Sequence, residues 1–517
     1  MSEPALTSPA NVALDTPNDA ATDAAATAAA DKRRWLILGV VAIAQLMIIL
    51  DSAIMNIALP SAANDLGIPP QDISWAITAY TLAFGGLLLL GGRIADYIGR
   101  KRAFLIGLVG FAVASGLGGA AQSEALLFAA RALQGAFGAL LAPASLAIIT
   151  VTFTSGRDRA RAFGVFGAIS GGGAAIGLIL GGVLTEYLGW RWCLYVNLPI
   201  ALIAVILGIR FVQESKAPGD RHLDVPGAVL SSLGLATLVY GFTEASKQQA
   251  DGTGTVGWGD PTVVTLLTVA VVLLVAFVIV ETRVKNPLLP MRIVLDRNRG
   301  GSYLIFLMIG AGLFSMFLFM TLYLQNILGY TPLKAGFAFL PFSIGIILGA
   351  GVVAQILPRV GPRPLMLVGI TLAIAGMLLL LRTTPDSSYA STVLPAITVM
   401  SLGMAAVFIP ASSTALVGVG KHDAGVASAL LNTSQQVGGS LGLALLSTFA
   451  ISATASKLTD LAGGAEPTQA MLATAQVAGY HVAYLGGAVL MFVGLVAALT
   501  LISAKKDDLP SESAIAA

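Results

Sequence analysis

Long apolar stretches separated by short polar segments make up most of the chain. An α-helix needs about 20 apolar residues to cross a hydrocarbon layer about 30 Å thick, and these stretches approach or exceed that length. They lie at 35–58, 73–92, 103–121, 125–152, 162–187, 192–212, 225–245, 261–281, 301–326, 333–356, 364–381, 390–418, 424–451 and 479–503. The pattern predicts an all-α integral membrane protein with fourteen transmembrane helices.

Two of these stretches, 125–152 and 390–418, are long and contain an internal proline, Pro143 or Pro410. Each fits either one span or two half-helices. We interpret each as one span, because lysine and arginine then gather in the loops on one side of the membrane. The loops on the other side carry only Arg191, Lys247, Lys334, Arg382 and Lys457. The positive-inside rule therefore predicts a multi-pass protein of the plasma (inner) membrane with both termini in the cytoplasm.

Composition agrees with this prediction. Only 11% of the residues are charged and 56% are hydrophobic, and the mean hydropathy is +0.85. A soluble domain has about 25% charged residues. The basic residues are spread over loops, which predicts no nucleic-acid partner. The lone Cys193 excludes a disulfide framework and a cysteine-rich metal site, and the sequence has no phosphate-binding loop, so we expect no metal, cofactor or ATP.

The ends of the chain differ from the rest. Residues 1–31 consist mainly of Ala, Thr, Asp, Ser and Pro, without a basic start or an apolar core. This predicts a disordered cytoplasmic tail and not a cleavable signal. The further division that we predict is a six-helix bundle at 32–213, two inserted transmembrane helices at 214–285, a second six-helix bundle at 286–504 and a cytoplasmic tail at 505–517.

A weak internal repeat supports two related bundles. The recurring segments are 80–102 with 342–364, and Gly173-x3-Gly177 with Gly438-x3-Gly442. Parallel repeats favour a substrate site at the interface between the two bundles. The alternative is chance recurrence in a chain with 58 glycines.

A charged turn bounded by glycines lies between the second and third stretches, with the sequence Gly92-Arg93-Ile94-Ala95-Asp96-Tyr97-Ile98-Gly99-Arg100-Lys101-Arg102. Charge this dense cannot lie in lipid, so the segment is a water-side turn between two membrane helices. The string resembles motif A of the major facilitator superfamily, with Tyr97 where many members carry a basic residue. The resemblance implies the major facilitator fold. It also implies that a conformational motif is formed by Gly92, Asp96, Gly99, Arg100 and Lys101.

Asp51 lies inside the first apolar stretch. A carboxylate at the centre of a membrane helix costs about 2.5–3.5 kcal/mol on insertion scales, which indicates a function. The surrounding string, from Leu50 to Pro60, resembles the span-one motif of proton-coupled drug antiporters. We therefore expect Asp51 to exchange a proton during transport. The alternatives are a static ion pair and a polar residue near the membrane interface.

Arg131 is the only basic residue that we place well inside a span. With Gln134 and Gly135 it is similar to motif B, R-x-x-Q-G, and the three positions share one helix face. An intramembrane guanidinium needs a partner. Asp51 is the nearest plausible one, provided that the superfamily's packing of spans one and four holds. In the alternative interpretation, Arg131 bonds backbone carbonyls and organises the bundle.

The fifth stretch is rich in glycine. The positions Gly164, Gly173, Gly177, Gly181 and Gly182 resemble motif C, the antiporter signature, with Leu178 where the family usually has proline. Small residues at this spacing let helices pack closely, which suits a hinge or a seal between the bundles. The alternative is ordinary helix packing without meaning for the direction of transport.

Two further strings, 323–330 and 432–442, resemble the fourteen-span EmrB/QacA-type drug:proton antiporter branch, and the resemblance covers residues 35–503. No Asp or Glu falls inside the last six predicted spans. Coupling chemistry is therefore expected in the first half of the chain. Glu244 is the other acid to consider, and we favour a solvated interface position for it over a proton site.

Met and aromatic side chains adapt to varied shapes, and with neighbouring glutamines they are candidates for the lining of a deformable apolar cavity. The candidates are Gln45, Met55, Tyr80, Phe84, Phe314, Phe317, Met320, Tyr323, Gln325, Met404 and Phe408. Many such residues in a membrane helix face lipid instead.

Together these features predict a monomeric transporter that is not an enzyme. Its expected function is proton-coupled efflux of small hydrophobic drugs or antibiotics, cationic ones included, by alternating access. Protons, the substrate and membrane lipids are its expected partners. An exporter or leaflet-mover of lipid-like or endogenous secondary metabolites is the alternative on the same fold. A membrane enzyme is disfavoured, because His222, His422 and His481 are scattered and no soluble domain is present.

Overall fold

A computed structural model describes residues 17–153, 156–216, 224–247, 256–285, 287–419 and 423–508, with side chains described from Arg33 onwards. These residues form helices and connecting turns and include no strand. The main helices are α1 (Pro17–Leu66), α2 (Trp75–Ile98), α3 (Arg100–Gly119), α4 (Glu124–Thr152), α5 (Gly156–Tyr187), α6 (Trp192–Tyr195), α7 (Asn197–Phe211), α8 (Val225–Ser246), α9 (Pro261–Arg283), α10 (Met291–Val294), α11 (Arg297–Leu322), α12 (Pro332–Ala338), α13 (Leu340–Val360), α14 (Pro362–Leu380), α15 (Leu394–Ala415), α16 (Ala424–Ala462) and α17 (Gln469–Thr500). Short π-helical turns at Tyr323–Ile327 and Tyr389–Val393 and a 3-10 turn at Lys506–Asp508 complete the described elements.

The all-α membrane prediction is confirmed. Thirteen helical segments in the described part of the chain are long and apolar enough to span a membrane. The remaining predicted span corresponds to α5, of which Gly172–Tyr187 is the apolar part. Pro143 and Pro410 lie inside the continuous helices α4 and α15, so the interpretation of each stretch as one span is also confirmed.

The predicted N-terminal tail differs from the structure. Helix α1 already begins at Pro17, so residues 17–31 are helical, whereas residues 1–16 lie outside the described residues, as do 509–517 of the predicted C-terminal tail. The segment from Ala20 to Ala30 is rich in alanine, the residue with the highest helix propensity. The prediction of disorder considered only the lack of an apolar core and missed this propensity.

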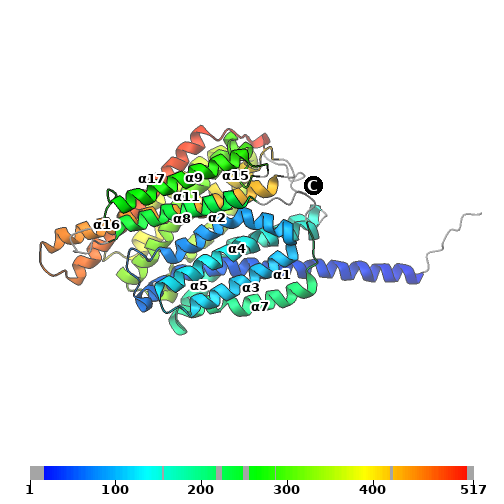
Figure 1. Cartoon of the computed structure of the whole chain (residues 1–517), viewed down its shortest axis with the longest axis horizontal. Coiled ribbons are helices and arrows are strands. Elements are labelled where there is room, and N and C mark those ends of the chain that lie inside the picture. The colour runs from blue at the N-terminus through cyan, green and yellow to red at the C-terminus, as the bar shows by residue number, and fades with distance from the viewer. Residues whose placement is uncertain are drawn as a thin grey trace, which may run out of the picture.

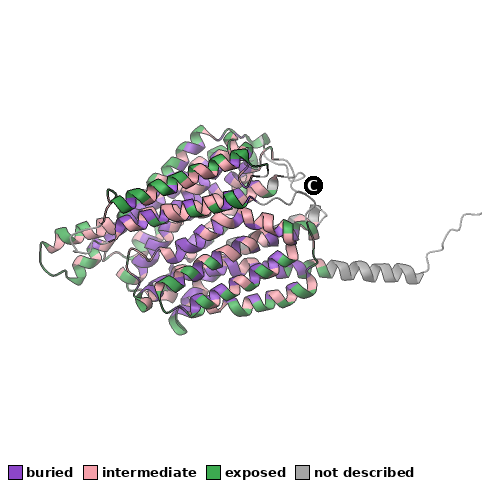
Figure 2. Ribbon diagram, viewed as in Figure 1, coloured by how far each residue is buried: buried purple, intermediate pink, exposed green. Residues whose placement is uncertain are grey.

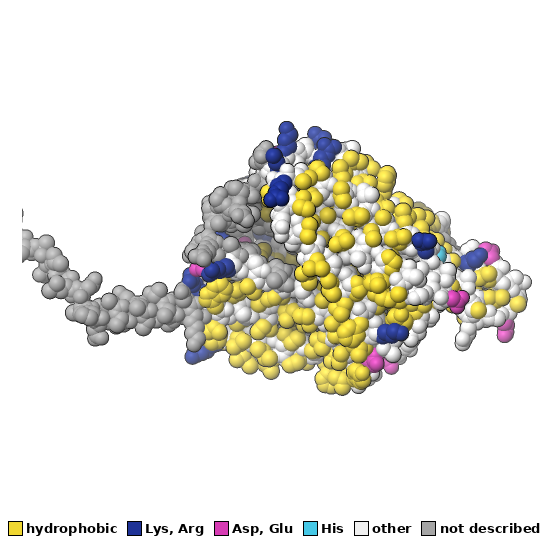
Figure 3. Space-filling view, turned by 180° about the vertical axis from the view of Figure 1, so that it is seen from behind, with side chains coloured by type: hydrophobic (Ala, Val, Ile, Leu, Met, Phe, Trp, Pro, Cys, Tyr) yellow, Lys and Arg dark blue, Asp and Glu magenta, His cyan; other side chains and the backbone are white. Residues whose placement is uncertain are grey.

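Two bundles and an additional helix pair make up the structure (Figure 1). Helices α1 to α7 form the first bundle and α11 to α17 form the second, while α8 and α9 pack on each other. We call the end of the molecule that carries the α2–α3 turn at Gly99 the basic end. The end at which α2 begins, at Trp75, is the opposite end. Figure 3 shows hydrophobic side chains over the middle of the outer surface and charged side chains mostly toward the ends.

The inserted helices α8 and α9 cover a line of contact between the bundles. Helix α8 packs on both α2 of the first bundle and α16 of the second. The hydroxyl of Thr448 on α16 donates to the carbonyl of Phe242 on α8 at 2.8 Å. The ring of Trp258 lies between those of Phe242 and Phe449. Much of α9 is exposed, in keeping with an apolar helix that faces lipid (Figure 2).

The two halves repeat the same local geometry. Gly99 and Gly361 each separate the second and third helices of their bundle and have φ values of 112° and 86°. Only glycine adopts such a conformation without strain. The fifth helix packs on the first in both bundles, α5 on α1 and α16 on α11. The internal repeat read from the sequence therefore has a structural counterpart.

Close helix packing in the second bundle depends on Gly438. A Cβ atom added at Gly438 would lie 2.0 Å from the backbone oxygen of Leu307 on α11. We expect Gly438→Ala to destabilise the protein by about 1–3 kcal/mol, because the backbone of α11 cannot move away without separating the two helices. Thermal unfolding in detergent measures this effect.

Gly425 provides the matched control on the same helix. A Cβ atom there would meet nothing within 4 Å, so Gly425→Ala should leave the unfolding midpoint unchanged or raised. Equal unfolding midpoints for the two variants would contradict the packing argument.

Candidate proton and substrate site

A cavity of about 1020 Å³ opens between the bundles at the basic end. Its inner wall is apolar and includes Ile48, Phe84, Leu88, Leu146 and Phe166. Its mouth is charged and is lined by Arg93, Asp96, Arg100, Glu281, Lys285, Arg292 and Asp423. An apolar interior behind a charged mouth suits a small hydrophobic ligand that enters from water.

At the opposite end the bundles are in contact. The amide of Gln325 donates to the carbonyl of Ile57 at 2.9 Å, and the backbone N–H of Leu333 donates to Glu186 at 3.1 Å. A Cβ atom at Gly182 would lie 2.6 Å from Leu333, and one at Gly336 would lie 2.5 Å from the oxygen of Leu178. One apolar core continues across both bundles here. The structure is therefore open toward the basic end and closed at the other.

Asp51 lies on α1, and only 1% of its surface is exposed. Its Oδ2 accepts a hydrogen bond from Arg131 Nη1 at 2.6 Å. Its Oδ1 accepts from Gln134 Nε2 at 2.6 Å and from Asn197 Nδ2 at 2.8 Å. Both oxygens thus face donors, and one of these donors is a cation. The arrangement matches an ionised carboxylate.

The second partner of this ion pair is equally enclosed. Arg131 has 1% of its surface exposed and also donates through Nη1 to Gln134 Oε1 at 2.8 Å. Its Nε donates to the carbonyl of Ala76 at 3.1 Å. Its guanidinium lies 4.4 Å from the centre of the Tyr80 ring, a cation–π contact. Arg131 therefore makes both contacts considered from the sequence, since it pairs with Asp51 and also binds a backbone carbonyl.

Two further members of this network were not anticipated from the sequence. Asn197 bonds Asp51 and also Ser115 Oγ at 2.9 Å, and Ser115 donates to the carbonyl of Leu194 at 2.7 Å. Each is a single polar residue in an apolar helix, which is too weak a signal without a contact map. The network now links α1, α3, α4 and α7, and the Ala76 carbonyl adds α2.

Two stacked rings separate the network from the cavity. Phe84 lines the cavity, and its ring stacks on that of Tyr80 at a centroid distance of 5.8 Å. Tyr80 in turn contacts Arg131. Asp51, Arg131 and Tyr80 do not line the cavity themselves.

Close backbone approach positions the motif B helix. A Cβ atom at Gly135 would lie 2.2 Å from the carbonyl oxygen of Tyr80, so only glycine allows α4 to pack this tightly on α2. The neighbouring Gln134 is fully buried and reaches Asp51. The two motif B residues thus make different contacts: Gly135 allows two helices to pack closely, and Gln134 belongs to the polar network.

The motif A residues lie at the basic end. Asp96 pairs with Arg100 at 3.3 Å, and both line the mouth of the cavity. Lys101 Nζ donates to the carbonyl of Ile209 at 2.8 Å, near the end of α7. Gly92 lies against Pro143 of α4. The turn therefore contacts α4 and α7 of the first bundle.

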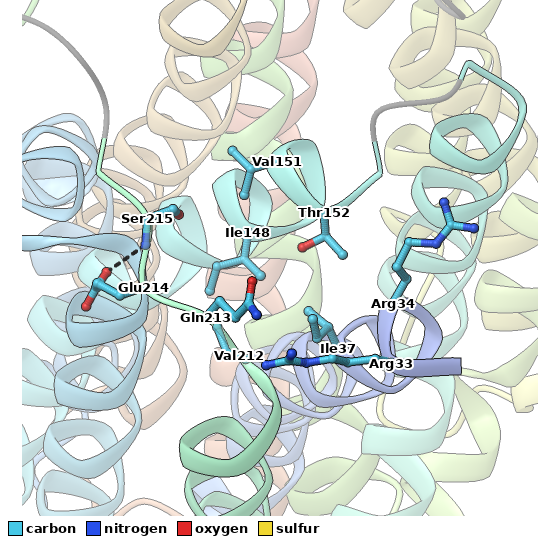
Figure 4. Close-up of a pocket in the computed structure, with 10 residues that line it drawn as sticks. All are labelled: Arg33, Arg34, Ile37, Ile148, Val151, Thr152, Val212, Gln213, Glu214 and Ser215. Atoms are coloured by element: carbon cyan, nitrogen blue, oxygen red, sulfur yellow. Dashed lines mark hydrogen bonds between the residues drawn. The ribbon is translucent and has the colours of Figure 1, made fainter. Parts of the chain in front are cut away.

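Glu214 holds this turn in place. Its Oε1 accepts from the backbone N–H of Lys101 at 3.2 Å and of Ser215 at 3.1 Å, and Arg100 N donates to the carbonyl of Ser215 at 2.9 Å. A Cβ atom at Gly99 would lie 2.4 Å from this carboxylate. Glu214 and Ser215 also line a smaller pocket of about 590 Å³ beside Arg33 (Figure 4). The segment after α7 is thus fixed to the start of α3.

The motif C glycines follow α1 and reach the second bundle. Gly173, Gly177 and Gly181 lie against α1, and Gly182 lies against Leu333 of α12. Gly164 has no neighbour within 4 Å. Helix α5 continues past Leu178 to Tyr187. Gly182 therefore lies at the seam that closes the opposite end, whereas the other three packed glycines join α5 to α1 inside the first bundle.

The predicted cavity residues separate into two groups. Gln45 and Phe84 line the cavity in this conformation. The others do not line it, and they are Met55, Tyr80, Phe314, Phe317, Met320, Tyr323, Gln325, Met404 and Phe408. Among these, Phe317 packs on Phe339, and Tyr323 donates to the carbonyl of Thr384 at 2.8 Å. Which side chains reach the cavity depends on the conformation, which a sequence does not specify.

Glu244 is in an ion pair near the opposite end. It lies 2.6 Å from Lys247, and both side chains are partly exposed. The hydrogen bond that Lys247 donates to Glu244 raises the pKa of Lys247 above its usual value. This contact agrees with the interface position that we favour for Glu244.

Comparison with known proteins gives consistent results. Residues 41–443 match the Major Facilitator Superfamily. The chain is 48% identical to the puromycin resistance protein pur8 of Streptomyces alboniger, over 94% of each chain. It is 39% identical to the cephamycin export protein CmcT of Amycolatopsis lactamdurans, over 81% of this chain and 85% of that one. A bacterial homologue of the human lysosomal transporter Spinster has a similar fold, with a TM-score of 0.61, 15% identity and coverage of 93% and 99%.

Arg131→Met tests the buried ion pair. We expect a loss of about 3–5 kcal/mol of stability, because Asp51 would remain buried without its cation. The double variant Asp51→Asn with Arg131→Met should be more stable than Arg131→Met alone. Thermal unfolding in detergent measures both.

Arg191→Met, which breaks the exposed pair with Asp65, is the control and should cost at most about 1 kcal/mol. Strictly additive losses in the double variant would contradict the coupling.

Proposed function

This chain belongs to the major facilitator superfamily of membrane transporters, and from that premise we propose that it exports small hydrophobic drugs or antibiotics in exchange for protons. Transport proceeds by alternating access, in which the central cavity opens to one side of the membrane at a time. The observation that carries the proposal is the buried carboxylate of Asp51 with its three donors and no contact with the cavity.

The proposed substrate class rests on two observations. The inner wall of the cavity is apolar, and its volume of about 1020 Å³ is at the upper end for drug-sized ligands. Two relatives are named for antibiotic resistance or export, one for puromycin and one for cephamycin.

The direction of transport rests on the charge distribution. The positive-inside rule assigns the basic end to the cytoplasm. The open cavity then faces the cytoplasm and is ready to receive a substrate for export.

The proton gradient supplies the energy for the proposed exchange. A proton that moves inward down a membrane potential of about 100 mV provides about 2.3 kcal/mol. A pH step of one unit adds about 1.4 kcal/mol.

Protonation of Asp51 is the proposed coupling step. A proton on either carboxylate oxygen would face a donor, because Arg131, Gln134 and Asn197 all donate to this group. The ion pair and at least one hydrogen bond would then be lost. Since these bonds join α1 to α4 and α7, the proton weakens the polar links between α1 and these two helices. Helix α1 also lies at the closed seam, where Ile57 accepts from Gln325.

Asp51→Asn tests proton exchange. We expect efflux of puromycin or a fluorescent dye against a gradient to be lost, because an amide cannot take up and release the proton. The measurement is efflux from cells that lack other pumps, with and without a protonophore. Glu466→Gln, at an exposed carboxylate of the α16–α17 connection, is the control and should transport normally. Protonophore-sensitive efflux by Asp51→Asn at the normal rate would refute the role.

Phe84→Ala tests the separation between cavity and network. The smaller side chain removes one of the two rings between the cavity and Arg131, so water reaches the ion pair. We expect passive proton entry into proteoliposomes without substrate to rise several-fold. Phe84→Leu, which keeps an apolar side chain of similar bulk, should leak less. Proton entry at the normal rate in both variants would show that the ring is not a barrier.

A further inference from the structure

Two buried carboxyl groups meet at the basic end of the inserted helices, away from Asp51. Asp224 begins α8, and its Oδ1 accepts from the backbone N–H of Gly227 at 2.9 Å. Glu281 lies in the last turn of α9, and its Oε2 accepts from the backbone N–H of Leu289 at 2.9 Å. Their exposed fractions are only 4% and 2%.

The remaining oxygen of each group has no hydrogen-bond partner. These atoms are Asp224 Oδ2 and Glu281 Oε1, and both are buried. They face the same small space, because a Cβ atom at Gly227 would lie 2.5 Å from one and 2.7 Å from the other. Any larger residue at position 227 would occupy this space. Glycine therefore lets the two carboxyl groups approach each other.

Charged groups nearby do not neutralise the pair. Arg283 and Lys285 follow Glu281 in sequence, and Arg93 and Asp96 belong to α2. Asp96 pairs with Arg100, and Arg292 pairs with Asp423 of α16. Within the described part of the chain, no cation forms an ion pair with Asp224 or Glu281. Arg221 and His222 lie outside the described residues.

Two carboxylates in contact, buried and without a cation among the described residues, cannot both stay ionised. A single proton resolves the conflict, because the O–H of one group then donates to the free oxygen of the other. We propose that Asp224 and Glu281 share one proton and form a second proton-binding site on the inserted helices. The proton comes from water in the cavity, which Glu281 lines, and forms an O–H bond with either carboxylate.

This site is placed to act on the mouth of the cavity. Glu281 holds Leu289, and the chain continues from there to Arg292, which pairs with Asp423 at the start of α16. Loss of the shared proton would separate the two carboxylates and move the start of α8 away from the end of α9. The connection to the second bundle would then change its position with the pH on the basic side.

The first experiment follows thermal unfolding of the full-length protein in detergent against pH. The folded pair retains a proton that the unfolded chain releases, so its stabilising effect is present at low pH and is lost as pH rises. We expect the unfolding midpoint of the natural protein to fall between about pH 5 and pH 8. Glu281→Gln and Asp224→Asn should weaken this fall, because an amide donates to the remaining carboxylate without a proton.

Glu244→Gln is the matched control on α8, since Glu244 is already paired with Lys247, and it should keep the natural pH profile. Parallel profiles for the natural protein, Glu281→Gln and Asp224→Asn would overturn the proposal. This test requires no transport, so its result is independent of proton exchange at Asp51.

A second measurement detects the proton directly. Infrared spectroscopy at neutral pH should show the carbonyl band of a protonated carboxylic acid in the natural protein and in Asp51→Asn. The band should be absent from both Glu281→Gln and Asp224→Asn. Absence of this band from the natural protein would refute the shared proton. Persistence of the band in both variants would also refute it, and the comparison with the natural protein remains decisive even if one variant folds poorly.

Discussion

The buried pair of Asp51 and Arg131 is the interaction on which the first bundle depends. Neither charge can reach water in this conformation, so each must be satisfied by the protein. The groups that bond them come from α2, α4 and α7 as well as α1, and Ser115 of α3 accepts from two of the donors, Gln134 and Asn197. The cost of placing charge in an apolar core therefore fixes the relative positions of five helices.

Helix packing uses glycine to bring these groups within bonding distance. Gly135 lets the backbone of α4 touch that of α2. This close packing places Gln134, the preceding residue of α4, within hydrogen-bond distance of Asp51. Gly177 does the same between α5 and α1, where it lies against Leu50 and Ala53 on either side of Asp51. The closed seam at the opposite end and the charge network thus share α1. Under the proposed function, a change in the bonds of Asp51 is for this reason also a change at the seam.

Much of the fold could be predicted from the sequence, because the length of apolar stretches and the distribution of basic residues depend on the bilayer and not on tertiary contacts. Asp51 and Arg131 were found because a lone charge in an apolar helix is conspicuous. Asn197 and Ser115 were missed because single neutral polar residues are common in such helices. The alanine-rich start of α1 was misjudged because a tail without a core can still be helical.

The cavity and the carboxyl pair could not be predicted, for different reasons. Most predicted cavity residues are packed elsewhere because the conformation decides which side chains face the opening, as Tyr323 and Gln325 illustrate at the closed end. Asp224 and Glu281 are separated by the whole α8–α9 hairpin, and each alone has the position of an ordinary helix-end acid. Only the packing of α8 on α9 brings them together across Gly227.

The two acidic sites differ in what surrounds the carboxyl oxygens, and this difference determines how each responds to a proton. Asp51 has a full set of donors, so a proton there breaks existing bonds. Asp224 and Glu281 have two free oxygens, so a proton there creates a bond. The first site lies inside a bundle, next to the closed end, whereas the second lies at the open end on the helix pair whose α8 touches both bundles. Under the two proposals, proton binding therefore loosens the structure at one end and tightens it at the other, so the two sites would act in opposite ways on the two ends of an alternating-access transporter.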